Sequence, residues 1–243
     1  MHRTTLALPL GLIAAGLAAC GSDASGPAAG FECIGQALPT TAPASINVSG
    51  TVNANVLSPA PVPGAYVYAF RTGDTTHLAG DTTDTPGRYS VDFTTGGTPV
   101  DGYLAVSDSG HHLDTYAYPA VPLAGNLTDN VLMVSSTEVT LIGPVLGVTQ
   151  DPAKGLMVVV VENCAGQQIQ GATVTTTPAG TVRYNGPAGP DQAASSTAAD
   201  GVAYVFNVTA GSVVVHANAS GHALRQHTVN ARANAFTLTA IQP

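Results

Sequence analysis

The sequence contains two copies of one pattern, and this duplication constrains the fold more than any other feature. The tripeptide Ser-Gly-His occurs at 109–111 and again at 220–222, each time after an apolar, alternating run. The letters GAYV at 64–67 match GATV at 171–174 in the same relative place. Self-similarity of this kind predicts a duplicated structural unit. Duplication therefore explains the doubled tripeptide better than a split active site built from histidines.

The composition favours an all-β fold for both copies. Thr and Val are frequent, and 27 Gly and 17 Pro punctuate the chain. β-Branched residues between frequent turn residues are typical of β-sandwiches. The segments 81–93 and 196–208 add a further pair of matching strands. Gly110 and Gly221 are expected to supply a positive φ in the two Ser-Gly-His turns.

The order of these motifs resembles a known family. An opening strand is followed by Gly-Ala-x-Val, then Thr-Asp-x-x-Gly-x-Tyr, then an apolar strand that ends in Ser-x-x-Gly-aromatic. This order is similar to the carboxypeptidase regulatory-like domain, and His111 and His222 stand where that family usually has Tyr. The resemblance implies two tandem transthyretin-like, Ig-like Greek-key β-sandwiches, at 46–134 and 155–243. It carries no activity, because the chain has no room for the separate catalytic domain of the zinc carboxypeptidases.

A linker at 135–154 separates the two copies. Ser135 and Glu138 have the spacing of a capping box, which marks the start of a helix. Gly143-Pro144 and the Thr-rich composition oppose a long helix. We expect either one short helix or an irregular linker.

The first residues have the features of an exported lipoprotein. Arg3 precedes an apolar run that is too short to span a bilayer, so 1–19 reads as a signal peptide. The ending Leu-Ala-Ala-Cys at 17–20 resembles the bacterial lipobox. That resemblance implies that Cys20 becomes the acylated first residue of the mature chain and anchors it to a membrane. An ordinary signal peptide with a chance cysteine is the alternative.

The segment that follows reads as a flexible tether over 20–45, rich in Gly, Ser and Ala. Gly21 and Ser22 are not the acidic residues that, in lipoproteins of this kind, favour retention in the inner membrane. The sequence therefore predicts an outer-membrane location on either the periplasmic or the surface face.

Cys33 and Cys164 remain after Cys20 is assigned to the lipid. The exported compartment permits disulfides, and the even number of remaining cysteines favours one disulfide bridge between them. Two separate buried thiols are the alternative.

The charge balance excludes one class of partner. The formal net charge is −8 at pH 7, and the chain has only seven Lys and Arg residues. A basic patch with interleaved aromatic residues is missing from the sequence, so a nucleic-acid partner is not expected. The charge balance does not exclude a protein or a glycan as the partner.

Motifs for catalysis are not found in the sequence, including zincin, P-loop and nucleophile-elbow patterns. The sequence therefore predicts no catalytic, cofactor or metal site. Two weaker metal hypotheses stay open. One is a transition-metal site that combines residues near the first Ser-Gly-His turn with a histidine upstream; the other is a calcium site in the loop 71–88. The residues concerned are His77, His111, His112 and Asp114 for the first, and Asp74, Asp81 and Asp84 for the second.

A fold analogy with intradiol dioxygenases would need a Tyr and His ligand set, for which the candidates are Tyr184, Tyr204, His222 and His227.

The loop 178–197 is a candidate binding loop. It is rich in Gly and Pro and carries Arg183 and Tyr184, which are residue types common at binding hot spots; a tolerated insertion is the alternative.

Together these features predict a non-catalytic envelope lipoprotein that binds a protein or glycan, or that spaces such a binder from the membrane. A small metal-dependent protein and an accessory subunit of a separate envelope enzyme are the alternatives.

Overall fold

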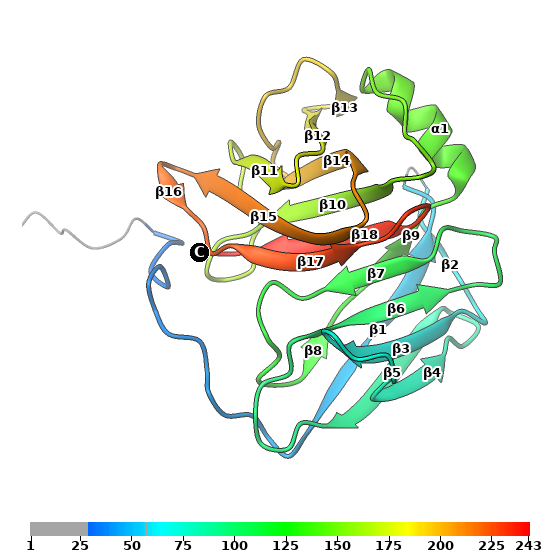
Figure 1. The fold of residues 1–243 in the computed structure, drawn as a ribbon, viewed down its shortest axis with the longest axis vertical. Coiled ribbons are helices and arrows are strands. Elements are labelled where there is room, and N and C mark those ends of the chain that lie inside the picture. Colours follow the sequence, from blue (N-terminus) through cyan, green and yellow to red (C-terminus); the bar gives the residue numbers. More distant parts are fainter. Residues whose placement is uncertain (1–28, 57) are drawn as a thin grey trace, which may run out of the picture.

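The computed structural model describes residues 29–56 and 58–243 and shows an all-β sandwich protein, with one helix in that part of the chain (Figure 1). The first repeat contains β1 (Ser45–Ala54), β2 (Ala60–Pro61), β3 (Tyr66–Arg71), β4 (Ala79–Thr82), β5 (Arg88–Thr94), β6 (Gly102–Ser107), β7 (Thr115–Tyr118), β8 (Leu127–Thr128) and β9 (Val131–Met133). The helix α1 (Ser136–Val145) follows. The second repeat contains β10 (Gly155–Val161), β11 (Thr173–Thr177), β12 (Thr181–Gly186), β13 (Gly189–Asp191), β14 (Val202–Val208), β15 (Gly211–Ala219), β16 (His222–Ala223), β17 (His227–Ala231) and β18 (Phe236–Ile241).

The two repeats have the same strand connections. β1 pairs antiparallel with β5 and parallel with β9, and β10 pairs in the same two ways with β14 and β18. In the opposite layer, β6 lies between β3 and β7, and β15 lies between β11 and β17. Each repeat is therefore a two-layer sandwich with the same topology.

A buried threonine makes the same hydrogen bonds in both repeats. The Thr83 hydroxyl accepts from Ala65 N (2.8 Å) and donates to Val62 O (2.6 Å). The Thr197 hydroxyl accepts from Ala172 N (2.9 Å) and donates to Ile169 O (2.6 Å). This match pairs residue 83 with residue 197, so the sequence comparison of 81–93 with 196–208 was wrong by one residue. The turns after the two threonines fix the alignment, because Gly87 and Gly201 both have positive φ there.

The Ser-Gly-His turns are equivalent, as the duplication predicts. Gly110 has φ 91° and Gly221 has φ 80°, which confirms the expectation for both glycines. Ser109 and Ser220 also have positive φ, at 63° and 50°. In the second repeat this conformation closes a two-residue hairpin between β15 and β16, as two consecutive left-handed residues do in a type I′ turn.

The sequence did not indicate that the two sandwiches share one sheet. β18 pairs in parallel with β7, in the register Phe236↔Thr115 to Thr239↔Tyr118. This pairing joins one layer of each repeat into a nine-stranded sheet with the order β13-β12-β14-β10-β18-β7-β6-β3-β4. The other layer of each repeat is a separate sheet, built around β1 in the first and around β15 in the second.

The two separate sheets cover opposite faces of the nine-stranded sheet. In the first repeat, Leu104, Val106 and Ala117 point into the core beneath β1 and β5. Met157 and Val159 of β10 point the other way, into the core beneath β15. The shared register therefore puts the outer face of one repeat on the same side of the sheet as the inner face of the other.

A third apolar cluster covers the outer face of β10, β14 and β18. Leu156, Val158, Tyr204, Phe206 and Phe236 form it together with residues of α1 and of the chain near β9. The strands of the second repeat are consequently buried on both faces, which explains why β10 reads GLMVVVV without alternation.

The helix α1 lies in the linker and begins as the capping box predicts. The Ser135 hydroxyl accepts from Glu138 N at 3.2 Å, and a Glu138 carboxylate oxygen accepts from Ser135 N at 2.9 Å. Val139 points into the third cluster, so the helix packs against the second repeat.

The repeated threonine makes a paired prediction. Thr83→Val and Thr197→Val should each lower the free energy of unfolding by about 1–3 kcal/mol, because the substitution leaves a buried backbone N–H without its acceptor. Urea unfolding with Thr85→Val as the exposed control measures this effect. Two variants as stable as the control would show that the hydroxyls do not hold the two turns.

Candidate functional site

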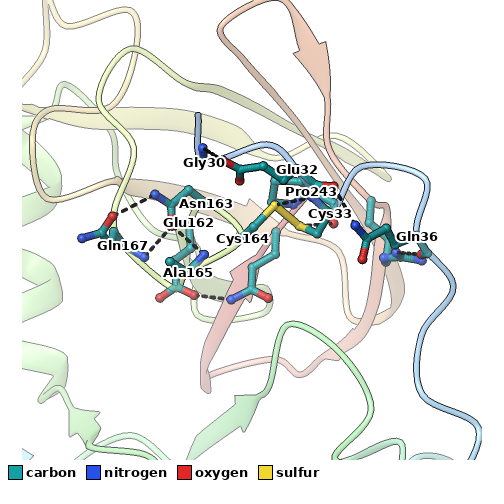
Figure 2. Close-up of a disulfide and its surroundings, with 12 residues drawn as sticks. Gly30, Glu32, Cys33, Gln36, Glu162, Asn163, Cys164, Ala165, Gln167 and Pro243 are labelled. Atoms are coloured by element: carbon teal, nitrogen blue, oxygen red, sulfur yellow. Dashed lines mark hydrogen bonds between the residues drawn. A yellow bond between two sulfur atoms is a disulfide. The ribbon is translucent and has the colours of Figure 1, made fainter. Parts of the chain in front are cut away.

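Cys20, the expected lipid attachment site, lies outside the described residues. The chain that follows is fixed to the second repeat by the disulfide Cys33–Cys164, with an S–S distance of 2.00 Å and a sequence separation of 131 (Figure 2). The backbone adds a hydrogen bond from Cys164 N to Gly30 O at 2.9 Å. The bridge expected between these two cysteines is confirmed.

Residues 20–28 of the expected flexible tether over 20–45 lie outside the described residues, and from Gly30 onward the expectation is corrected. Phe31 is buried at 5% exposure and lies 5.0 Å from the His222 ring, so it belongs to the core of the second repeat. Arg225 donates to Gln36 O at 2.9 Å. The segment then runs along one side of the molecule to β1, where Ala44 O accepts from Thr95 N (Figure 1). An apolar side chain and a disulfide hold this segment in place, and composition alone did not reveal them.

The loop 178–197 does not present its two candidate binding residues to a partner. It forms β12 and β13, which extend the nine-stranded sheet. Tyr184 is 6% exposed in the core of the second repeat, and its hydroxyl accepts from Val174 N at 2.9 Å. The Arg183 guanidinium donates to Leu146 O (2.7 Å) just past α1. Both residues hold the fold together, so the expected binding loop is corrected.

The histidines near the first Ser-Gly-His turn bond to the turn itself. His112 Nδ1 pairs with the Asp108 carboxylate, and His111 Nδ1 lies 2.9 Å from Asp108 O. His77 packs instead against the Tyr68 ring, with centroids 4.8 Å apart. Within residues 29–56 and 58–243, no three His, Cys, Asp or Glu side chains form a group that could hold a metal ion.

Two of the three aspartates considered for calcium in the loop 71–88 cap backbone groups. Asp81 accepts from Ser90 N (2.8 Å), and Asp84 accepts from Arg88 N (2.7 Å). Both carboxylates thus fix the hairpin that leads into β5, which is a structural use of residues considered for calcium.

The residues considered for an intradiol-type site lie apart. Tyr184 belongs to the inner core of the second repeat, and Tyr204 belongs to the cluster on the opposite face of the sheet. His227 contacts the Thr239 hydroxyl at 2.9 Å. The sheet itself therefore separates the two tyrosines.

An unexpected surface feature is a row of aromatic side chains on the outer face of the first repeat. We call it the aromatic strip; it consists of Tyr66, Tyr68, Phe70, His77, Tyr103 and Tyr116. Neighbouring ring centroids lie 4.8–6.4 Å apart along the row. Tyr66 is 44% exposed, and Tyr68, Phe70 and Tyr103 are partly exposed. The strip thus crosses β3 and β6 and reaches β7.

An arginine from the second repeat closes one end of the strip. The Arg232 guanidinium lies 3.7 Å from the Tyr116 ring centroid and 5.0 Å from that of Tyr103. It also donates to the hydroxyls of Tyr103 (3.1 Å) and Tyr118 (3.4 Å). The stacking and the hydrogen bonds therefore hold the charged group of Arg232 at the junction between the repeats.

The signal for the strip was present in the sequence. The letters YVYAF of 66–70 alternate as a strand does, but the aromatic side chains take the positions that face solvent. Alternation locates the two faces of a strand without stating which face is covered.

A groove with a volume of about 500 Å³ lies between the repeats on the opposite side of the nine-stranded sheet. Leu238 and Val158 line its apolar part, and Asp129 of the first repeat and Glu162 of the second supply carboxylates. Burial, and then the charge of Glu162, raise the pKa of Asp129, and burial raises the pKa of Glu162. Among the residues that the structure describes, neither carboxylate has a cationic side chain at ion-pair distance.

The raised pKa of Asp129 gives a pH prediction. A carboxyl whose pKa is higher in the folded state stabilises the fold most below its unfolded pKa of about 3.9, and that contribution is lost as the pH rises through the folded pKa. Asp129→Asn should therefore gain stability relative to the parent protein as the pH rises from 4 to 7. Urea unfolding across this range, with the exposed Asp74→Asn as control, measures the gap. A gap that is constant or that shrinks with pH would contradict the assignment.

Comparisons with known proteins give structural neighbours only. No protein-family model matches the chain. No curated protein matches it either. The chain is similar to the shaft pilin SpaA from Lactobacillus rhamnosus GG, with 10% identity, 82% of this chain and 98% of the pilin covered, and a TM-score of 0.27. GBS52, a minor pilin of Streptococcus agalactiae, has 8% identity, with 81% of this chain and 95% of GBS52 covered and a TM-score of 0.25. The Bacillus anthracis TIE protein has 10% identity, with 82% of this chain and 35% of the TIE protein covered and a TM-score of 0.25. Such low TM-scores transfer no function to this chain.

Proposed function

We propose that this protein is a non-catalytic lipoprotein of the cell envelope whose two carboxypeptidase regulatory-like repeats form one rigid binding or spacer module. The observation that carries the proposal is the disulfide between Cys33 and Cys164. The segment leading from the expected lipid site is tied by a disulfide and by Phe31 to the second repeat. A module fixed this close to its anchor can hold a surface at a set position above a membrane.

The membrane attachment is proposed from Cys20 and its lipobox-like flank. Among the described residues, no helix is long and apolar enough to cross a bilayer. Acylation of Cys20 would supply the attachment, since several acyl chains give stable binding where one is marginal. The non-acidic Gly21 and Ser22 favour the outer membrane.

The shared sheet supports a structural role for the whole body. Tension on the anchor would enter the second repeat at Cys164, at the end of β10, and reach the first repeat through the pairing of β18 with β7. The side chains of Asp81, Asp84 and His112, three of the candidate metal ligands, are engaged in turns and caps instead. Both observations support a binding or spacing role over chemistry.

The test of lipidation is Cys20→Ala, which should move the protein from the membrane fraction to the soluble fraction after cell lysis. Ser25→Ala is the matched control and should stay with the membranes. Density-gradient separation of the membranes checks the outer-membrane location. Undiminished membrane association of Cys20→Ala would contradict the lipid anchor.

A further inference from the structure

A cleft with a volume of about 270 Å³ lies between α1 and the chain that leads into β10. We call it the helix cleft. Its apolar wall includes Leu113, Val139, Pro144, Val148, Leu156 and Ala235. It shares no lining residue with the groove between the repeats or with the aromatic strip. A mostly apolar hollow close to the usual 300–1,000 Å³ of small-molecule sites, about the lower end of that range, is a candidate ligand site.

The helix cleft contains the only lysine of the chain. Lys and Arg together number seven, and Lys154 is the one lysine among them. Lys154 lines the cleft and is only partly exposed. Its backbone is fixed on both sides, because Lys154 N donates to Asp151 O at 3.0 Å and Lys154 O accepts from Asn234 N at 3.1 Å. These bonds hold the base of the lysine side chain at the cleft.

The charge of Lys154 is left without a carboxylate partner. Across residues 29–56 and 58–243, no Asp or Glu lies at ion-pair distance from its ammonium group. Asp151 is close in the sequence, but its carboxylate accepts from Ala153 N at 2.8 Å. No acidic residue is among the described residues that line the cleft. In a chain with a net charge of −8, this is a local site that favours an anion.

The polar group nearest to Lys154 in the lining does not compete for that anion. The Gln150 amide donates to Lys154 O at 3.3 Å and to Gly155 O at 3.2 Å, and its oxygen accepts from Asn207 N at 3.0 Å. Gln150 therefore serves the backbone. An apolar wall with one free cation suits a ligand that has an anionic group at one end and an apolar tail at the other.

The size of the cleft limits the length of that tail. Its volume equals that of about nine waters in the liquid, and a methylene group takes up about as much space as a water. A tail of about seven carbons next to a carboxylate therefore fills the cleft. A small molecule suits this volume better than a segment of a partner protein.

We infer that the helix cleft binds a medium-chain monocarboxylate, with the carboxylate paired to Lys154 and the apolar tail against Val139 and Leu156. A carboxylate accepts charge-assisted hydrogen bonds from an ammonium group, and the apolar wall removes the tail from water. This inference goes beyond the proposed envelope role and does not depend on the lipid at Cys20.

The test is calorimetric titration, at pH 7, of the full chain as purified from cells and held in phosphatidylcholine nanodiscs. The probe is octanoate, and octanol and octylammonium are the probes with the same chain but another charge. Octanoate should bind saturably and at least about tenfold more tightly than octanol, the ratio expected of a hydrogen bond to a charged group. Because Lys154 is the only lysine, ¹⁵N-lysine labelling gives one backbone amide signal, and octanoate should shift it with the same midpoint.

Variants connect the binding to the cleft. Lys154→Gln should weaken octanoate binding by about tenfold, whereas Lys154→Arg keeps the charge and most of the affinity. Arg88→Gln is the matched control, because it removes one exposed cation from the first repeat and should bind like the parent protein. Thr140→Phe puts a ring into the cleft from an exposed position of α1 and should also weaken binding. Circular dichroism confirms that each variant is folded.

Any of three results would overturn the inference. They are no saturable binding of octanoate, equal affinity for octanoate and octanol, and a Lys154→Gln variant that binds octanoate as tightly as Arg88→Gln. Octanoate that enters only the lipid of the nanodiscs gives the second and third of these results. Cell fractionation of Cys20→Ala reads out a different property, so a failed cleft test and a failed lipidation test are distinguishable.

Discussion

The parallel pairing of β18 with β7 is the contact on which the rest of the structure depends. It makes one sheet from a layer of each repeat and removes two sheet edges that would otherwise attract other chains. It also puts Thr237 and Thr239, buried at 0% and 4% exposure, between tyrosines of the first repeat and the core of the second. The groove lies at this junction on one side of the sheet, and the aromatic strip ends at the junction on the other side.

The junction also explains why the repeats differ in composition. β5 alternates between buried and exposed residues, as a strand with one solvent face does. β14 carries Tyr204 and Phe206 on the face that would be polar in an isolated sandwich, because α1 and the neighbouring cluster cover it. Tyr66, Tyr68 and Phe70 on the outer face of the first repeat have no such cover and stay at least partly exposed.

Local rules predicted local features of this protein. The capping box at Ser135 and Glu138, the positive φ of Gly110, and the bridge between Cys33 and Cys164 each follow from a few residues and are confirmed. The partner of β18 could not be predicted in this way, because the pattern of a strand does not name its neighbour. For the same reason the sequence does not predict that Tyr184 is buried, because its burial depends on the pairing of β12 with β14.

The central claim is that the two repeats form a single cooperative unit. Differential scanning calorimetry of the full-length chain in detergent, beside the double variant Cys33→Ser/Cys164→Ser, tests it most directly. The account predicts one transition for each protein, with equal calorimetric and van't Hoff enthalpies. The variant should be destabilised, by about 4–5 kcal/mol at most for a loop of this length, without splitting into two transitions. Two separable transitions in the oxidised parent protein would contradict the account.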